Sequence, residues 1–135
     1  MTYAHQMIDA APRRPAPPFD DVAALVAAID ACLECAQACA GCADACLSED
    51  RVADLRRCIR LNADCADVCA ATVAVLTRAG EGTEAVVRAL LVACMEVCRA
   101  CGQECANHAQ THEHCAVCAD ACRRCEAACE MLLRA

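Results

Sequence analysis

The sequence predicts an all-α protein, an up-down-up-down antiparallel four-helix bundle with a cysteine-lined core. Cysteines recur at steps of three and four residues, which is the spacing of one face of a helix. The apolar content of 59% is carried mainly by Ala, Val, Leu and 17 Cys, with one Tyr, one Phe and no Trp, and such small side chains allow helices to approach closely. A length of 135 residues suits a single domain, so we divide the chain into an N-terminal extension, 1–18, and one bundle, 19–135.

The N-terminal extension begins with a segment, residues 3–11, that is long enough for two helical turns. Prolines then follow, and a proline disfavours helix in the residue before it. They stand at Pro12, Pro15, Pro17 and Pro18. We expect residues 1–18 to form a short helix or an arm outside the bundle.

The first bundle helix is predicted over residues 19–47. The carboxylates of Asp20 and Asp21 in its first turn interact favourably with the positive end of the helix dipole. Apolar residues follow between Val22 and Ile29. Its sulfur stripe comprises Cys32, Cys35, Cys39, Cys42 and Cys46. At about 100° per residue these thiols span an arc of roughly 80° on one side of the helix.

The second helix is predicted to start after Ser48, which suits an N-cap, and to end near Arg78 before Gly80 and Gly82. Its stripe is shorter and spans an arc of roughly 40°. It comprises Cys58, Cys65 and Cys69, with Asn62 where the spacing would place another thiol.

The third helix is predicted to start at Thr83 as its cap and to carry Cys94, Cys98, Cys101 and Cys105. The fourth carries Cys115, Cys118, Cys122, Cys125 and Cys129. Spacing alone also permits one helix over 84–133, about 75 Å long at 1.5 Å per residue. We predict a turn instead, because the step from Cys115 to Cys118 is out of phase and the polar segment 107–114 suits a connection capped by Thr111.

The net charge of −7 argues against binding to nucleic acid or to an anionic membrane surface. No segment approaches the roughly 18 uninterrupted apolar residues of a membrane span. Arg13 and Arg14 lack the apolar stretch that follows the twin arginines of an export signal. We therefore expect a cytoplasmic protein, whose thiols stay reduced and point to metal or redox chemistry.

If all four stripes face inward, the bundle axis becomes a tube lined with thiols. Cysteine as a simple packing residue and a ladder of disulfides are the alternatives, and both explain 17 such positions poorly. Structural zinc favours separate sites with four ligands, and iron–sulfur clusters need loop spacings that this chain lacks. A continuous strip of thiolates suits Cu(I), the soft ion that selects cysteine, with release of thiol protons on binding.

The two ends of the predicted tube differ in polarity. The polar end gathers Cys46, Asp54, Cys58, Cys105, His108, His112, His114 and Cys115, and the apolar end gathers Ile29, Val73, Leu76, Leu90, Leu91 and Leu132. We expect Cu(I) to arrive at the polar end, with His108 and His112 as first ligands because they alone extend a sulfur stripe. His114 is interpreted chiefly as a solvated turn residue, and Asp54 and Asn62 chiefly as ordinary polar residues instead of aids to entry. His5 and Met7 reach metal only if the extension folds over an end.

These stripes resemble those of the cytosolic branch of the bacterial copper storage proteins, over about residues 19–135. The resemblance implies a homotetramer that stores many Cu(I) ions per chain or buffers them against toxicity, supplied by a copper chaperone or a small-thiol donor. It implies as ligands the 17 cysteines of the four stripes together with His108 and His112. Asn62 interrupts the second stripe and departs from a complete ladder.

Two other functions remain open at the level of sequence. A zinc or cadmium thiolate buffer predicts four-thiolate sites that prefer divalent ions. A thiol redox reservoir predicts disulfides that form reversibly without metal. We do not expect an enzyme, because the sequence contains no recognisable acid–base pair, nucleophile triad or phosphate-binding loop.

Overall fold

The computed structural model describes all 135 residues and contains only helices and their connections. The elements are α1 (Tyr3–Ala10), α2 (Val22–Leu47), the short 3₁₀ helix η1 (Val52–Leu55), α3 (Arg56–Thr77), α4 (Glu84–His108) and α5 (Glu113–Arg134). The predicted all-α class is confirmed. The polar segment after His108 is a turn, so the alternative of one continuous helix over 84–133 is wrong.

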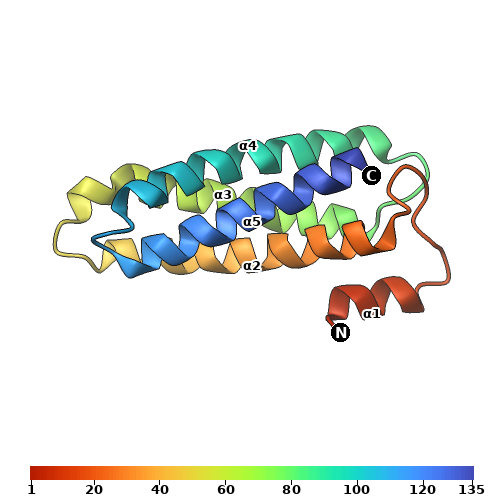
Figure 1. The fold of residues 1–135 in the computed structure, drawn as a ribbon, viewed down its shortest axis with the longest axis horizontal. Coiled ribbons are helices and arrows are strands. Elements are labelled where there is room, and N and C mark those ends of the chain that lie inside the picture. Colours follow the sequence, from red (N-terminus) through yellow and green to blue (C-terminus); the bar gives the residue numbers. More distant parts are fainter.

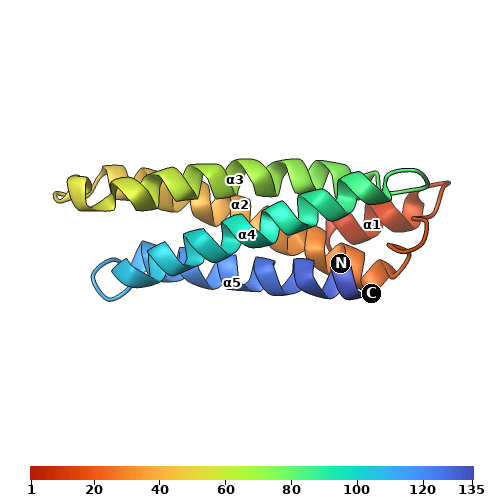
Figure 2. The same cartoon turned by 90° about the horizontal axis from the view of Figure 1, so that it is seen from above.

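The four long helices run antiparallel to their neighbours in the sequence and enclose a single axis (Figure 1). α2 packs against α3 and α5, and α4 packs against the same two helices, so α2 lies diagonally across from α4 and α3 from α5. The view turned by 90° shows the same closed arrangement (Figure 2). This is the predicted up-down-up-down four-helix bundle.

One end of the bundle is closed by large apolar side chains. Those that are almost fully buried there are Leu25, Ile29, Leu76, Val87, Leu91 and Leu132. Val73 and Leu90, which we also assigned to this end, are only half-buried. Val87 and Leu91 are four residues apart and both buried, so this face of α4 points inward. Leu90 is turned about 100° away from Leu91 around the helix axis and is therefore only partly covered.

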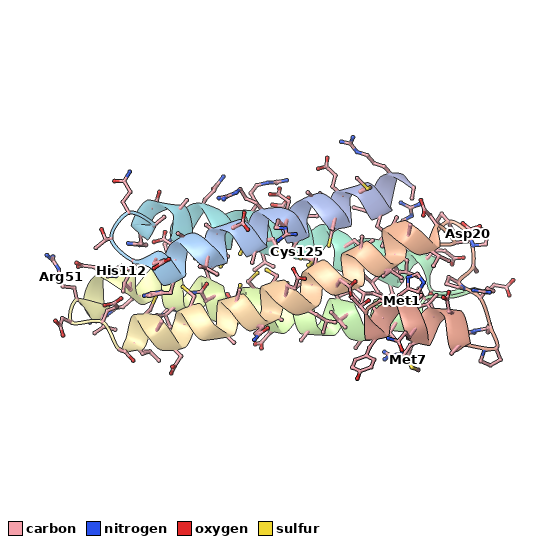
Figure 3. All side chains as sticks on the ribbon, turned by 60° about the horizontal axis from the view of Figure 1, so that its bottom comes forward. Met1, Met7, Asp20, Arg51, His112 and Cys125 are labelled. Carbon is pink, nitrogen blue, oxygen red and sulfur yellow. The ribbon has the colours of Figure 1, made fainter.

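The N-terminal extension packs at this closed end. It contains the helix α1, and the Thr2 hydroxyl donates a hydrogen bond to Asp30 of α2 over 3.0 Å. Ile8 of α1 and Phe19 are both buried. Met1 and Asp20 lie at one end of the molecule, and Arg51 and His112 lie at the other (Figure 3). The C-terminus also lies at the closed end (Figures 1 and 2).

Three of the predicted helix starts are wrong in detail. α2 begins at Val22 instead of Phe19, because the Asp21 carboxylate accepts from the backbone N–H of Ala24 and caps it there. Ser48 is the C-cap of α2, and η1 separates it from α3. The residue before α5 is His112 and not Thr111.

The third helix does start directly after Thr83, as predicted, but the Thr83 hydroxyl does not cap it. It donates to the carbonyl of Gly80 over 2.7 Å and so closes the turn between α3 and α4. Gly82 in that turn has φ +85°, a conformation that favours glycine.

By length and hydropathy alone, α2 could cross a membrane, although its apolar residues are interrupted by charged ones. Its most apolar 18-residue window has mean hydropathy 1.7 and is 44% buried within the bundle. The core helix of a water-soluble bundle meets the same criterion, so this property is weak support for a membrane span.

Candidate metal centre

The 17 cysteines form one column of thiols along the bundle axis. All are buried and all are free, with no disulfide among them. Contacting sulfur atoms from different helices lie 3.5 Å apart at the shortest, between Cys125 and Cys32. The longest pairs, such as Cys39 with Cys101, are 4.0 Å apart. The predicted inward orientation of all four stripes is confirmed.

Four groups of four thiols follow one another from the closed end toward the middle of the column. They are Cys32, Cys94, Cys125 and Cys129; Cys35, Cys69, Cys98 and Cys125; Cys35, Cys39, Cys65 and Cys122; and Cys39, Cys101, Cys118 and Cys122. Within each group all sulfur atoms lie within 4.8 Å of one another. The first and second groups share Cys125, the second and third share Cys35, and the third and fourth share Cys39 and Cys122. These shared thiols can bridge metal ions, so the groups are not isolated sites.

The sulfur spacing suits a soft metal ion. Three sulfurs around an ion at metal–sulfur distances of about 2.3 Å lie roughly 4.0 Å apart, and four in a tetrahedron lie roughly 3.8 Å apart. Sulfur pairs at 3.5 to 4.0 Å match both values. The thiols therefore fit metal ions with little rearrangement, and the absence of oxygen ligands in these groups favours Cu(I) over harder ions.

Asn62 is the one polar side chain of the bundle that interrupts this column. It is fully buried on α3, and its amide nitrogen donates to the Cys58 sulfur over 3.6 Å. Its amide oxygen accepts from the thiols of Cys101 and Cys118, at 3.1 and 3.2 Å. The amide thus occupies the position of a missing thiol and is satisfied entirely by its sulfur neighbours.

A fifth group lies at the histidine end and contains an imidazole. It consists of Cys42, Cys46, His114 and Cys115. Nδ1 of His114 lies 3.4 Å from the Cys42 sulfur and 3.6 Å from the Cys115 sulfur. We had interpreted His114 chiefly as a solvated turn residue, since it does not continue the three-and-four spacing. The sequence feature that indicates this contact is the position of His114 directly before Cys115, at the start of a helix whose sulfurs face inward.

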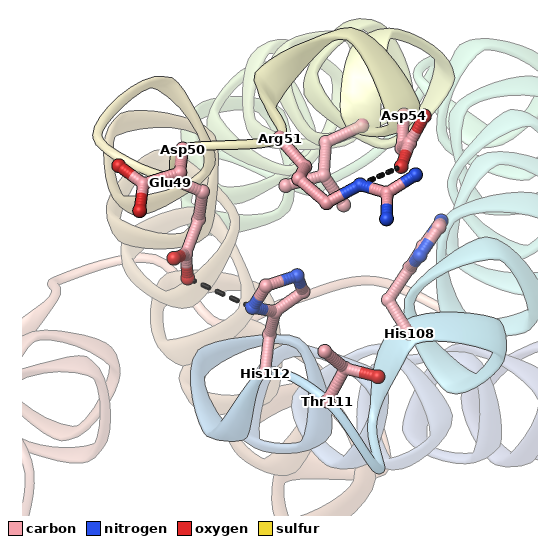
Figure 4. A pocket seen from close by; sticks show the side chains of 8 residues that line it. Glu49, Asp50, Arg51, Asp54, His108, Thr111 and His112 are labelled. Atoms are coloured by element: carbon pink, nitrogen blue, oxygen red, sulfur yellow. Dashed lines mark ion pairs between the residues drawn. The ribbon is translucent and has the colours of Figure 1, made fainter.

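His108 and His112 lie at the same end but do not hydrogen-bond to a cysteine. Nε2 of His108 contacts Glu104 over 2.9 Å, and Nδ1 of His112 contacts Glu49 over 2.8 Å. Both rings line a cavity of about 360 Å³, together with Arg51 and other residues of the α2–α3 connection (Figure 4). The structure therefore separates two roles: His108 and His112 face a polar cavity, and His114 faces the sulfur column.

The other polar residues considered in the sequence have different surroundings. Asp54 pairs with Arg51 over 2.8 Å at the rim of the same cavity. His5 pairs with Asp9 within α1, and Met7 is exposed, so neither joins a group of thiols.

The electrostatics of the histidine end distinguish one thiol from its neighbours. Hydrogen bonds from Cys105 and Cys58 lower the pKa of Cys42 to about 5, although a hydrogen bond to Cys118 and burial oppose this shift. Burial instead raises the pKa of Cys46 and of Cys115. A thiolate at Cys42 beside an imidazole is well suited to receive a first cation.

This chain is similar to a known protein family and to several solved structures. The sequence profile of a family described as copper storage protein matches residues 21–134 of this chain. A copper storage protein from Streptomyces lividans, loaded with 10 copper equivalents, superimposes with a TM-score of 0.92 at 53% identity, over 97% of this chain and 98% of that one.

Two further solved structures are similar. A cytosolic copper storage protein from Streptomyces lividans with five coppers has a TM-score of 0.82 at 60% identity, over 84% of this chain and 94% of that one. A Cu(I)-bound copper storage protein 3 from Bacillus subtilis has a TM-score of 0.71 at 37% identity, over 78% of this chain and 94% of that one.

Proposed function

Because this chain belongs to the copper storage protein family, we propose that it holds a reserve of Cu(I) on the thiolates of its 17 cysteines. The observation that carries this function is the sharing of cysteines between successive thiol groups along the axis. Shared thiolates bridge ions, so the number of ions approaches the number of sulfurs instead of one for every four.

The proposed ligands are every cysteine of the column and, at the histidine end, His114. His108 and His112 are proposed to receive Cu(I) in the polar cavity before it reaches sulfur. Their carboxylate partners Glu49 and Glu104 give this cavity an acidic character that attracts a cation. The thiolate of Cys42 is then the first sulfur ligand, because its lowered pKa leaves it deprotonated at neutral pH.

We propose that the chain acts in the cytoplasm as a store and not as an enzyme. A reducing compartment keeps thiols free, which agrees with 17 free cysteines. A storage site needs many equivalent ligands, whereas a catalytic metal site keeps one position open for substrate. A small thiol or a copper chaperone is the proposed donor, since ligand exchange between thiolates moves Cu(I) without releasing it to water.

A homotetramer is the proposed assembly. Large apolar side chains are exposed on the outer faces of the long helices, including Leu33, Val92, Val117 and Met131. Contact between copies would remove this apolar area from water. Sedimentation of the reduced protein measures the assembly directly.

The proposed storage function is tested by titrating reduced, metal-free protein with Cu(I) under anaerobic conditions against a competing chelator. The same titration is repeated with Zn(II). Tight binding of more than roughly ten Cu(I) per chain, with displacement of zinc, is the expected result. Saturation near about four ions, with zinc held as firmly, would instead indicate a divalent-metal buffer with separate four-thiolate sites.

A further inference from the structure

One carboxylate at the histidine end contacts two imidazoles at once. Glu49 lies in the connection that follows α2, two residues after Leu47. Its oxygen Oε2 is 2.8 Å from Nδ1 of His112 and 2.9 Å from Nε2 of His114. The two rings are stacked, with centroids 5.4 Å apart and planes inclined by 22°. Glu49 therefore holds both rings, His112 through its Nδ1 and His114 through its Nε2.

This contact determines which nitrogen of each ring is left for a metal. An ionised carboxylate accepts hydrogen bonds and cannot donate them, so the nitrogen that faces Glu49 carries the proton. In His114 the protonated nitrogen is Nε2, and Nδ1 is the nitrogen directed at the sulfurs of Cys42 and Cys115. In His112 the remaining nitrogen is Nε2, on a ring that lines the polar cavity.

We propose that Glu49 is a positioning residue for copper uptake, which holds His114 in the tautomer and orientation that present Nδ1 to Cu(I) beside Cys42 and Cys115. The proposal rests on the storage function above and adds a residue that touches no thiol. Histidine ligands commonly donate their second ring N–H to a carboxylate, and loss of such a partner costs about 10-fold to 100-fold in metal affinity.

The chain contains a matched control for this proposal. Glu104 also accepts from a histidine at the same end, through Nε2 of His108, and it is paired with Arg57 over 3.3 Å. His108 makes no hydrogen bond to a thiol, in contrast to His114. Removal of the Glu104 carboxylate therefore changes the charge of this end by the same amount without altering an imidazole that faces sulfur.

The experiment compares the full-length reduced protein with Glu49→Ala, Glu49→Gln and Glu104→Ala. Nitrogen NMR of the ring of His114 in the metal-free protein reports its tautomer, and competition with a Cu(I) chelator reports the affinity for the first ion added. For the unaltered protein we expect the Nε2–H tautomer, and a shift of the Nδ1 resonance on addition of one equivalent of Cu(I).

In Glu49→Ala we expect a mixture of tautomers and a first-ion affinity lower by about 10-fold to 100-fold, with total capacity unchanged. Glu49→Gln, whose amide oxygen can still accept from Nε2–H, should restore much of the affinity. Glu104→Ala removes the same charge but should leave the tautomer of His114 unchanged and lower the first-ion affinity by less than Glu49→Ala does.

An unchanged tautomer and affinity in Glu49→Ala, or a shift at Nε2 on copper binding, would overturn the proposal. A merely structural role would lower helicity and total capacity along with the affinity. If the unaltered protein instead saturates near about four ions, the storage function itself fails, and this outcome is separate from the comparison of variants.

Discussion

The amide oxygen of Asn62 on α3 accepts a hydrogen bond from the thiol of Cys118 on the diagonally opposite helix α5, over 3.2 Å. A single side chain thus spans the axis at the point where the sulfur column would otherwise be continuous. It lies between the cysteines of the histidine end and the four groups that share thiols. Asn62 therefore limits the number of thiolates at this level without leaving an empty space.

Replacement of Asn62 by Cys should raise the capacity for Cu(I) by about one ion per chain, because it completes the stripe of Cys58, Cys65 and Cys69 on α3. Anaerobic titration against a chelator measures this. Asn62→Ser is the matched control, since the side chain of serine differs from that of cysteine only by oxygen in place of sulfur and adds no thiolate. Equal capacities of the two variants would show that the position cannot bind metal.

The double substitution of His108 and His112 by Ala should slow copper loading and leave capacity nearly intact, because both rings line the cavity outside the sulfur column. Stopped-flow mixing with a Cu(I)–chelator complex measures the rate, and titration measures the capacity. His5→Ala, at the other end of the molecule, should change neither. A large loss of capacity at an unchanged rate would contradict a role in uptake.

Cys42 should be the first thiol of the metal-free protein to react with iodoacetamide at neutral pH. Its pKa is lowered from 9.0 to about 5, so the reactive thiolate already dominates at pH 7, and the labelling rate should level off once the pH exceeds this pKa. A surface groove of about 400 Å³ beside Gly41 and Val117 gives a small reagent access.

Peptide mass spectrometry across a pH series identifies the labelled site. Cys46, at the same end, is the internal control, because burial raises its pKa and its labelling should increase only at alkaline pH. Faster labelling of Cys46 than of Cys42 at neutral pH would contradict this assignment.

Replacement of Leu132 by Ala should lower the free energy of unfolding of the metal-free protein by about 2–5 kcal/mol, since its fully buried side chain closes the apolar end. Arg124→Ala is the control: Arg124 is exposed on the same helix, and a surface change of this kind is worth less than about 0.5 kcal/mol. Circular dichroism during denaturant unfolding measures both.

The same spectra test whether the metal-free chain is already helical, as expected if thiols pack as a core. A coil that becomes helical only when metal is added would show that the column does not exist before loading. Capacity for copper should be retained in Leu132→Ala, because Leu132 belongs to none of the thiol groups.

The bundle and its sulfur column could be predicted from sequence because a repeat of three and four residues fixes which side of each helix faces the core. All 17 cysteines obey this rule and are buried. The same reasoning placed the apolar and polar ends correctly, since the order of four antiparallel helices determines which residues share an end.

The details of the histidine end could not be predicted in this way. The contact of His114 with Cys42 joins residues that are 72 positions apart and depends on how the turn before α5 directs the first residues of that helix. Glu49 lies in a connection whose shape is set by η1, which replaced the N-cap that we expected at Ser48. Helical periodicity carries no information about either connection.

The C-terminus lies at the closed end, remote from the three histidines (Figures 1 and 2). A tag, a fluorescent partner or a surface linker attached to the C-terminus would therefore extend away from the polar cavity. Chains immobilised through their C-terminus would all present the histidine end to the solution. The molecule can thus be used as an oriented copper sorbent without alteration of a single residue in its interior.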